Sequence, residues 1–191
     1  MNKKVECISE VLPRTTNFRI LDLLINTAQW ELGSDSVPLT YKNYIEASDK
    51  KDLGFTYKTF DIYNNVNITT ELNTYANLIF DTIQKFCRSY KLIKPTRYIW
   101  NYYNRWSEGT WHVDNGNDPE GDYITAIYNL NRSDGYLQIK QFDSGTEDAR
   151  IYNSSPSEAI VFHSGLEHRG VGPSKFTGRF NLAMMMELKW M

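Results

Sequence analysis

Two segments in the first half of the chain carry apolar residues at the three- and four-residue spacing of an amphipathic helix. The first is expected to begin with an N-cap at Thr16-Asn17 and to end at Gly33-Ser34-Asp35. The second opens at Thr69-Thr70-Glu71, and its apolar stripe runs from Leu72 to Tyr90. Each pattern has a single apolar face, so both helices are predicted to pack against a sheet.

The rest of the pattern is extended rather than helical. Residues 3–12 resemble a first strand ended by Pro13, and residues 34–67 mix loops with one or two short strands around Tyr57 to Tyr63. Beyond Pro95, short apolar runs alternate with turn residues. The predicted strands there are Arg97 to Tyr103, Trp111 to Asp114, Tyr123 to Leu130, Tyr136 to Ile139, Ala159 to Phe162, His168 to Val171 and Arg179 to Leu188. Many short strands after two helices predict an α+β fold whose strands form a sandwich or barrel.

Composition narrows the class of protein further. The chain has 191 residues, of which 41% are hydrophobic and 23% charged, and this favours a single globular domain. A formal net charge of -2 makes nucleic acid an unexpected partner. Cys7 and Cys87 lack metal-type spacing, which favours free thiols in a reducing compartment. Because we find neither a signal-like start nor an apolar run of membrane-spanning length, we expect a cytoplasmic protein with no membrane partner.

Candidate metal ligands begin with the pair His112 and Asp114, which are two positions apart. On an extended segment such residues point to the same side, because side chains alternate with a period of two. The chain has three histidines, and the other two, His163 and His168, lie in one short downstream segment. Two histidines and one carboxylate on one face of a metal are typical of non-haem Fe(II) oxygenases. The residues alone leave open whether His163 or His168 completes the set.

An arginine follows the last histidine in a suggestive position. From His168 the chain passes through a Gly/Pro-containing loop and reaches Arg179 at the start of an apolar strand. A buried arginine needs a partner, and its planar fork suits a carboxylate bound through two contacts. Asn181 shares the face of Arg179 by strand alternation and could add a hydrogen bond. The pattern favours an anionic ligand beside the metal.

Taken together, these motifs resemble the Fe(II)- and 2-oxoglutarate-dependent dioxygenases, in particular the prolyl-4-hydroxylase-like branch. The matching pieces occur in the family's order between residues 97 and 188: a Tyr-rich strand, His112-Val113-Asp114-Asn115, Thr125-Ala126-Ile127-Tyr128-Asn129-Leu130-Asn131, Asp134-Gly135, Ala159-Ile160-Val161-Phe162, His168 and Gly178-Arg179. The resemblance implies a double-stranded β-helix (jelly-roll, cupin-like) core with N-terminal bracing helices. Residues 1–95 would form the helical and strand support, and residues 96–191 the metal-binding core of a single 1–191 domain.

The resemblance also implies roles for individual residues. His112, Asp114 and His168 would hold the metal, with His168 preferred to His163 because it follows the apolar strand by several residues. Arg179 would pair with the distal carboxylate of 2-oxoglutarate.

Three further residues are expected at the co-substrate. Tyr103 is expected to contact it, with Tyr102 as the alternative, and Asn181 is expected to assist. Hypoxia-sensing members have a tyrosine in the position of Asn129, so Asn129 is a departure that alters this part of the co-substrate site.

The implied activity is hydroxylation of an unactivated C–H bond, driven by O2 and by oxidative decarboxylation of 2-oxoglutarate. The implied cofactors are Fe(II) and the co-substrate 2-oxoglutarate, with ascorbate as an optional addition. A prolyl residue of a peptide or protein is the leading substrate by family analogy, and a free amino acid or small metabolite is the alternative. A non-catalytic metal-binding jelly-roll module is the opposing class. Residues 115–122 have the composition of a lid over the substrate.

Overall fold

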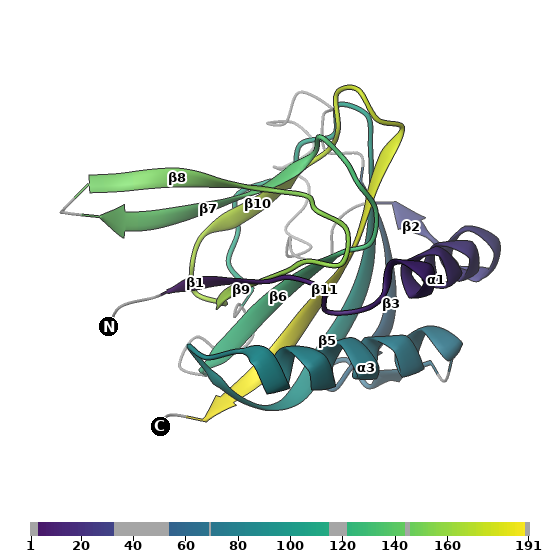
Figure 1. Cartoon of the computed structure of the whole chain (residues 1–191), viewed down its shortest axis with the longest axis horizontal. Coiled ribbons are helices and arrows are strands. Elements are labelled where there is room, and N and C mark those ends of the chain that lie inside the picture. The colour runs from purple at the N-terminus through teal and green to yellow at the C-terminus, as the bar shows by residue number, and fades with distance from the viewer. Residues whose placement is uncertain (1–3, 33–53, 69, 115–121, 144–145, 190–191) are drawn as a thin grey trace.

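The computed structural model describes residues 4–32, 54–68, 70–114, 122–143 and 146–189. The strands in these ranges form a major sheet of eight strands and a minor sheet of three, which lies over one face of the major sheet (Figure 1). The major sheet has the order β1-β9-β6-β11-β5-β3-β2, with β4 beside β3, and the minor sheet has the order β10-β7-β8. The predicted double-stranded β-helix is confirmed.

The strands of both sheets pair antiparallel throughout. In the major sheet they are β1 (Val5–Ile8), β2 (Glu31–Leu32), β3 (Gly54–Asp61), β4 (Val66–Asn67), β5 (Lys91–Asn104), β6 (Tyr123–Asn129), β9 (Ala159–His163) and β11 (Gly178–Lys189). In the minor sheet they are β7 (Tyr136–Asp143), β8 (Thr146–Asn153) and β10 (His168–Val171). The first half of the chain therefore supplies strands to the major sheet, and β5 crosses the expected boundary at residues 95/96.

The long pair formed by β5 and β11 lies at the centre of the major sheet and separates two environments. On one face, Trp100 and Leu182 join the main hydrophobic core beneath the helices. On the other face, Asn101, Tyr103 and Asn181 line a pocket between the sheets. This alternation follows from the two-residue period of a strand.

Among the described residues, two helices cover the face of the major sheet opposite the minor sheet: α1 (Arg14–Thr27) and α3 (Glu71–Phe86) (Figure 1). Their buried residues, among them Ile20, Leu24 and Ile79, belong to the main core. The predicted bracing role is thus confirmed. Neither of the described helices is both long and apolar enough to cross a membrane.

The predicted limits of α1 are wrong at both ends. The helix begins after Pro13 rather than at Thr16-Asn17, and it ends at Thr27, well before Gly33. Asn17 is buried inside the helix, where its Nδ2 donates to Ser157 Oγ at 2.9 Å and its Oδ1 accepts from the Tyr128 hydroxyl at 2.5 Å. Its side chain is engaged in long-range contacts instead of capping the helix.

The second helix begins at Glu71, as predicted, but it ends at Phe86 instead of continuing to Tyr90. The carboxylate of Glu6 accepts hydrogen bonds from the backbone N–H of Arg88 at 3.0 Å and of Ser89 at 2.9 Å. These bonds from β1 hold the chain in a turn, and β5 starts at once after it. The change to strand therefore comes before Pro95.

Two strand predictions also differ from the structure. The segment Trp111 to Asp114 forms only an isolated bridge, at His112, and no strand. The strand β8 was not predicted because it is a largely exposed edge strand, whose charged residues Asp148 and Arg150 give no apolar alternation. The proposed lid lies almost wholly in residues 115–121, outside the described residues.

Candidate metal centre

The three candidate ligands come from two chain segments joined by backbone hydrogen bonds. The N–H of His112 donates to the His168 carbonyl at 3.0 Å, and the N–H of His168 donates to the His112 carbonyl at 2.9 Å. The N–H of Asp114 donates to the Ser164 carbonyl at 3.0 Å. The segment after β5 is thereby fastened along the start of β10, and all three side chains are brought to one place.

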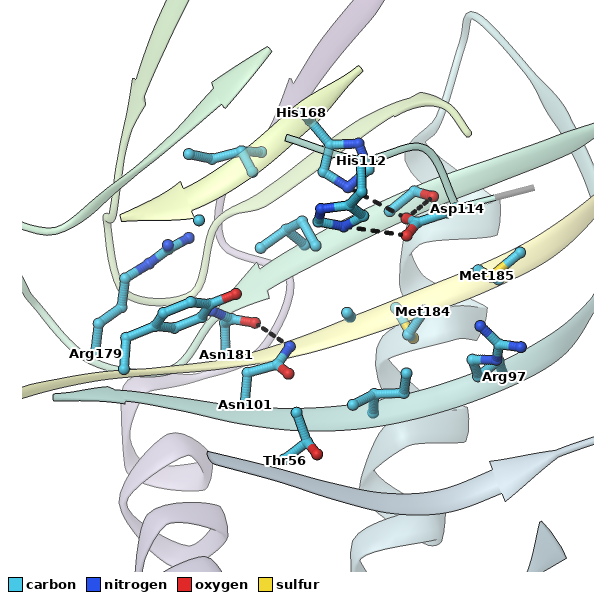
Figure 2. Close-up of a pocket in the computed structure, with 17 residues that line it drawn as sticks. Thr56, Arg97, Asn101, His112, Asp114, His168, Arg179, Asn181, Met184 and Met185 are labelled. Atoms are coloured by element: carbon cyan, nitrogen blue, oxygen red, sulfur yellow. Dashed lines mark hydrogen bonds and ion pairs between the residues drawn. The ribbon is translucent and has the colours of Figure 1, made fainter. Parts of the chain in front are cut away.

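The side chains of His112, Asp114 and His168 converge on a common point (Figure 2). The Nε2 atom of His112 lies 3.5 Å from Asp114 Oδ1, and the Nε2 atom of His168 lies 3.3 Å from Asp114 Oδ2. One ligand atom from each residue lies within 4.8 Å of the other two. These separations suit three ligands of a single metal ion with bond lengths of about 2.0–2.2 Å.

Backbone carbonyls fix which nitrogen of each imidazole faces that point. His112 Nδ1 lies 2.8 Å from the Thr110 carbonyl, and His168 Nδ1 lies 2.9 Å from the Leu166 carbonyl. A carbonyl oxygen only accepts, so each Nδ1 must carry a proton, and loss of the other proton leaves a lone pair on Nε2 that can bind a metal. Outer-shell bonds of this type orient metal-binding histidines.

The carboxylate of Asp114 is held on its other side by hydroxyl groups. Thr125 Oγ1 donates to Asp114 Oδ2 at 2.6 Å and lies 2.8 Å from Ser164 Oγ. Burial would raise the pKa of Asp114, but the two imidazoles, His168 foremost, hold that pKa well below its usual range. The carboxylate is therefore ionised, as metal binding requires.

The competing residue His163 lies outside this cluster. Among the described His, Cys, Asp and Glu side chains, the metal-type group contains His112, Asp114 and His168 without His163. Instead, His163 ends β9, where its Nδ1 accepts the backbone N–H of Gly165 at 3.0 Å. That bond gives it a place in the turn between β9 and β10.

Arg179 is a buried cation at the other side of the pocket (Figure 2). Its side chain is 1% exposed, and burial lowers its pKa to about 10. One Nη donates to the Tyr136 carbonyl at 2.9 Å, whereas its Nε is buried without a hydrogen-bond partner. Within the described chain, no carboxylate forms a salt bridge with Arg179. A buried guanidinium without a counter-ion is unfavourable unless an anion binds there.

Tyr103 and Tyr102 point to opposite faces of β5. Tyr103 pairs with Arg179 across the strands, lines the pocket, and places its ring 5.4 Å from the guanidinium carbon. Tyr102 stacks on Phe180 at 4.6 Å on the helix side. The Tyr103 hydroxyl packs so closely on Gly170 that a Cβ there would lie 2.5 Å from it, so a larger residue at that position would displace the Tyr103 ring.

The two asparagines expected at the co-substrate occupy different places. Asn181 lines the pocket and accepts a hydrogen bond from Asn101 Nδ2 at 3.0 Å. Asn129 contacts Arg179, with its Oδ1 3.4 Å from an Nη of that residue, and also accepts from Ser154 Oγ at 3.1 Å. Asn129, in the position where hypoxia-sensing members of the family have tyrosine, thus places its side-chain amide against Arg179.

Sequence reasoning missed several polar residues around the pocket, among them Thr56, Arg97, Asn101 and Thr125 in its lining and Ser164 beside Asp114. Thr125 and Ser164 support Asp114, and Arg97 lines the pocket on β5. The sequence did contain a signal for two of them. Thr125 is a polar residue in the otherwise apolar start of β6, and Arg97 shares the parity of Tyr103 on its strand.

The side chains that line the pocket match the Fe(II) ion and the 2-oxoglutarate that the sequence implied. Two imidazoles and one carboxylate match the ligands of non-haem Fe(II), and a backbone carbonyl or a hydroxyl group holds each of them. In the part of the chain that the structure describes, Arg179 has a buried Nε without a hydrogen-bond partner and no carboxylate counter-ion, which suits a dicarboxylate such as 2-oxoglutarate. The pocket connects both features, because it is lined by the three ligands and by Arg179.

The sequence matches no protein-family model and no curated protein. Solved structures resemble the fold closely despite low identity. A 2OG-Fe(II) oxygenase family oxidoreductase from Burkholderia pseudomallei has a TM-score of 0.68 and 13% identity, over 96% of this chain and 84% of that one. A prolyl-4-hydroxylase from Pseudomonas putida has a TM-score of 0.61 and 14% identity, over 98% and 94% of the two chains.

A third structure shows that the same fold accompanies different chemistry. The non-heme α-ketoglutarate-dependent epimerase SnoN from nogalamycin biosynthesis has a TM-score of 0.66 and 10% identity, over 97% of this chain and 79% of that one. The three structures share an architecture with this protein over nearly its whole length. The chain therefore has the double-stranded β-helix fold of the 2OG-Fe(II) oxygenases.

Proposed function

We propose that this protein is an Fe(II)- and 2-oxoglutarate-dependent dioxygenase that hydroxylates an unactivated C–H bond. The single observation that carries the proposal is one pocket lined by the His112, Asp114 and His168 cluster and by the buried Arg179, which has no carboxylate partner among the described residues. The overall reaction balances as substrate C–H, 2-oxoglutarate and O2 giving substrate C–OH, succinate and CO2. Bound iron supplies the activation of O2.

The residues of the chain have distinct roles in this proposal. The Nε2 atoms of His112 and His168 and the carboxylate of Asp114 hold the metal and leave other coordination positions open. Arg179 binds the distal carboxylate of 2-oxoglutarate and gains a counter-ion. Tyr103 lies over the guanidinium and bounds the co-substrate space, with Asn181 beside it.

Asn129 supports this arrangement by a contact to Arg179. It is a positioning residue in the proposal, because it is not among the side chains that line the pocket. The ordered shell around the metal and the burial of Arg179 both restrict water near the co-substrate. Restricted water strengthens electrostatic contacts at such a site.

A prolyl residue in a peptide or protein is the leading substrate class. Its support is the likeness in fold to the prolyl-4-hydroxylase from Pseudomonas putida. A free amino acid or small metabolite is the second candidate, since SnoN shares the fold and belongs to a small-molecule pathway. A cytoplasmic location and the use of ascorbate belong to the same proposal and rest on sequence alone.

The proposal is tested by incubating the purified protein with Fe(II), 2-oxoglutarate and O2 together with proline-containing peptides. We expect succinate to form and a peptide to gain the mass of one oxygen atom. The variant Asp114→Ala serves as the control and should give neither product. A protein that binds metal but never binds 2-oxoglutarate would instead be a non-catalytic metal-binding module.

A further inference from the structure

A second arginine, Arg97, lines the same pocket at the end remote from Arg179. The strand register pairs Arg179 with Tyr103 and Arg97 with Met185. From Tyr103 back to Arg97 the backbone of β5 covers roughly 20 Å at the rise of a β-strand. Figure 2 shows the two arginines on opposite sides, with the metal-ligand cluster above the strands that connect them. The pocket therefore has a cationic group at each end.

The position of Arg97 is fixed by a buried carboxylate. Its Nε donates to Asp61 Oδ2 at 3.0 Å, and the Asp61 side chain is 0% exposed. Asp61 is itself held by the backbone N–H of Tyr63 at 3.0 Å and by Asn64 Nδ2 at 2.7 Å. An arginine anchored through its Nε on a rigid partner keeps its two terminal nitrogens in a defined direction.

Those terminal nitrogens are available to a ligand. Within the described residues, Asp61 is the only group that pairs with Arg97, and it does so through Nε. The side chain of Arg97 is 12% exposed and lines the pocket. Two guanidinium nitrogens held in a fixed direction suit a ligand carboxylate, which they can bind through two parallel hydrogen bonds.

The proposed binding of 2-oxoglutarate does not explain why Arg97 lines the pocket. In the proposed function 2-oxoglutarate lies between Arg179 and the metal, whereas Arg97 borders the part of the pocket beyond the metal ligands. Met185, directly opposite Arg97, and Ile99, two residues along β5 toward Tyr103, also line the pocket and offer an apolar surface to a carbon skeleton.

We propose that the substrate carries a carboxylate and that Arg97 binds it, so Arg97 selects the substrate and places its C–H bond near the metal. This inference rests on the proposed function and narrows its substrate class. The carboxylate could belong to a free amino acid or to an acidic side chain of a peptide, and both share the chemistry that a guanidinium recognises. Arg97 would thus discriminate against neutral analogues of the same shape.

The test is calorimetric titration, without O2, of protein loaded with Fe(II) and saturating 2-oxoglutarate. Saturation keeps the probes away from Arg179. The probes are the standard L-amino acids against their α-carboxamides, and acetyl-prolyl-glutamyl amide against acetyl-prolyl-glutaminyl amide. In the wild type we expect at least one acid to bind about tenfold or more tighter than its amide, as for a charge-assisted contact. The pair that shows the preference identifies the source of the carboxylate.

Substitutions then assign the preference to Arg97. Arg97→Gln should reduce it to about twofold or less, and Arg97→Lys should leave an intermediate value because the fork is lost while the charge stays. Lys94→Gln is the matched control, since Lys94 lies on the same strand, is 60% exposed and pairs with Glu187 at 3.1 Å. It should keep the full preference.

Folding is controlled for in two ways. The ratio of acid to amide affinity is measured within each variant, so a partly unfolded sample does not change it. The double variant Asp61→Asn/Arg97→Gln removes both charges of the buried pair and should behave as Arg97→Gln.

Three results would each overturn the inference. The wild type could bind acid and amide equally, the preference for the acid could survive in Arg97→Gln, or no acid could bind while 2-oxoglutarate does. Failure of 2-oxoglutarate itself to bind would instead contradict the proposed function.

Discussion

His112 and His168 exchange a pair of backbone hydrogen bonds, at 3.0 and 2.9 Å, and their rings lie 4.4 Å apart between centroids. These backbone hydrogen bonds bring the two imidazoles together. Carbonyl oxygens fix both Nδ1 atoms, and the two Nε2 atoms face Asp114. A site prepared in this way loses little ordering entropy when the ion binds.

The first prediction concerns the metal ligands. His112→Ala and His168→Ala should each abolish tight Fe(II) binding, because each removes one of three protein ligands. His163→Ala is the matched control and should retain most of the affinity, since its Nδ1 is engaged with Gly165. The measurement is anaerobic Fe(II) titration of each variant. Equal loss in His163→Ala would show that the distal ligand has been misassigned.

The second prediction concerns the hydroxyl that orients Asp114. Thr125→Val keeps the shape of the side chain but removes the hydrogen bond to Asp114 Oδ2. We expect metal affinity to fall about 10–100-fold, as is typical when an outer-shell partner is lost. Thr125→Ser retains the hydroxyl and should bind nearly as the wild type does. Indistinguishable affinities for valine and serine at this position would mean that the hydroxyl has no orienting role.

Local sequence patterns predicted the parts of the site that lie on one segment. The two-residue period of a strand predicted that His112 and Asp114 point to one side and that only one of Tyr102 and Tyr103 faces the pocket, whereas the preference for Tyr103 came from the family resemblance. The choice of His168 over His163 came from the family resemblance, because both residues occur in one short segment. Only the pairing of His112 with His168 brings the remote histidine to the cluster.

Contacts between distant segments could not be predicted in the same way. The bond from Thr125 to Asp114 and the anchoring of Arg97 by Asp61 depend on strand register, which is set by the whole sheet. The start of α1 was misplaced because Asn17 has the composition of an N-cap but makes buried long-range bonds. Local preference was overridden there by tertiary contacts.

The third prediction concerns the co-substrate anchor. Arg179→Ala should weaken 2-oxoglutarate binding by about 2–5 kcal/mol while leaving Fe(II) affinity unchanged, because a buried charge partner is lost. Arg179→Lys should also bind more weakly than the wild type, since lysine cannot make two parallel contacts. Both affinities are obtained by calorimetry on the metal-loaded variants. Unchanged 2-oxoglutarate affinity in Arg179→Ala would place the anchor elsewhere.

The fourth prediction concerns stability and pH. Burial would raise the pKa of Asp61, but Asn64 and Arg97 lower it by more, so folding favours the ionised form. This stabilisation is fully present above the unfolded pKa of about 3.9 and is lost as pH falls through the lower folded value. Asp61→Asn should therefore cost about 1–3 kcal/mol at neutral pH.

The difference in the free energy of unfolding between wild type and Asp61→Asn should be constant from about pH 5 to 7. It should shrink below about pH 4, where the wild-type carboxylate becomes protonated. Urea denaturation at several pH values measures the free energy of unfolding of both proteins. A difference in unfolding free energy that grows as the pH falls would contradict a pKa of Asp61 that is lowered by folding.

The most direct test of the central claim is a single exposure to O2 of protein loaded anaerobically with Fe(II) and 2-oxoglutarate. The two cofactors occupy one pocket in this account, held by His112, Asp114 and His168 on one side and by Arg179 on the other. The measurement is the amount of succinate formed per protein. We predict succinate from the wild type and none from His168→Ala. Recovery of all the 2-oxoglutarate unchanged from metal-loaded wild type would contradict the account.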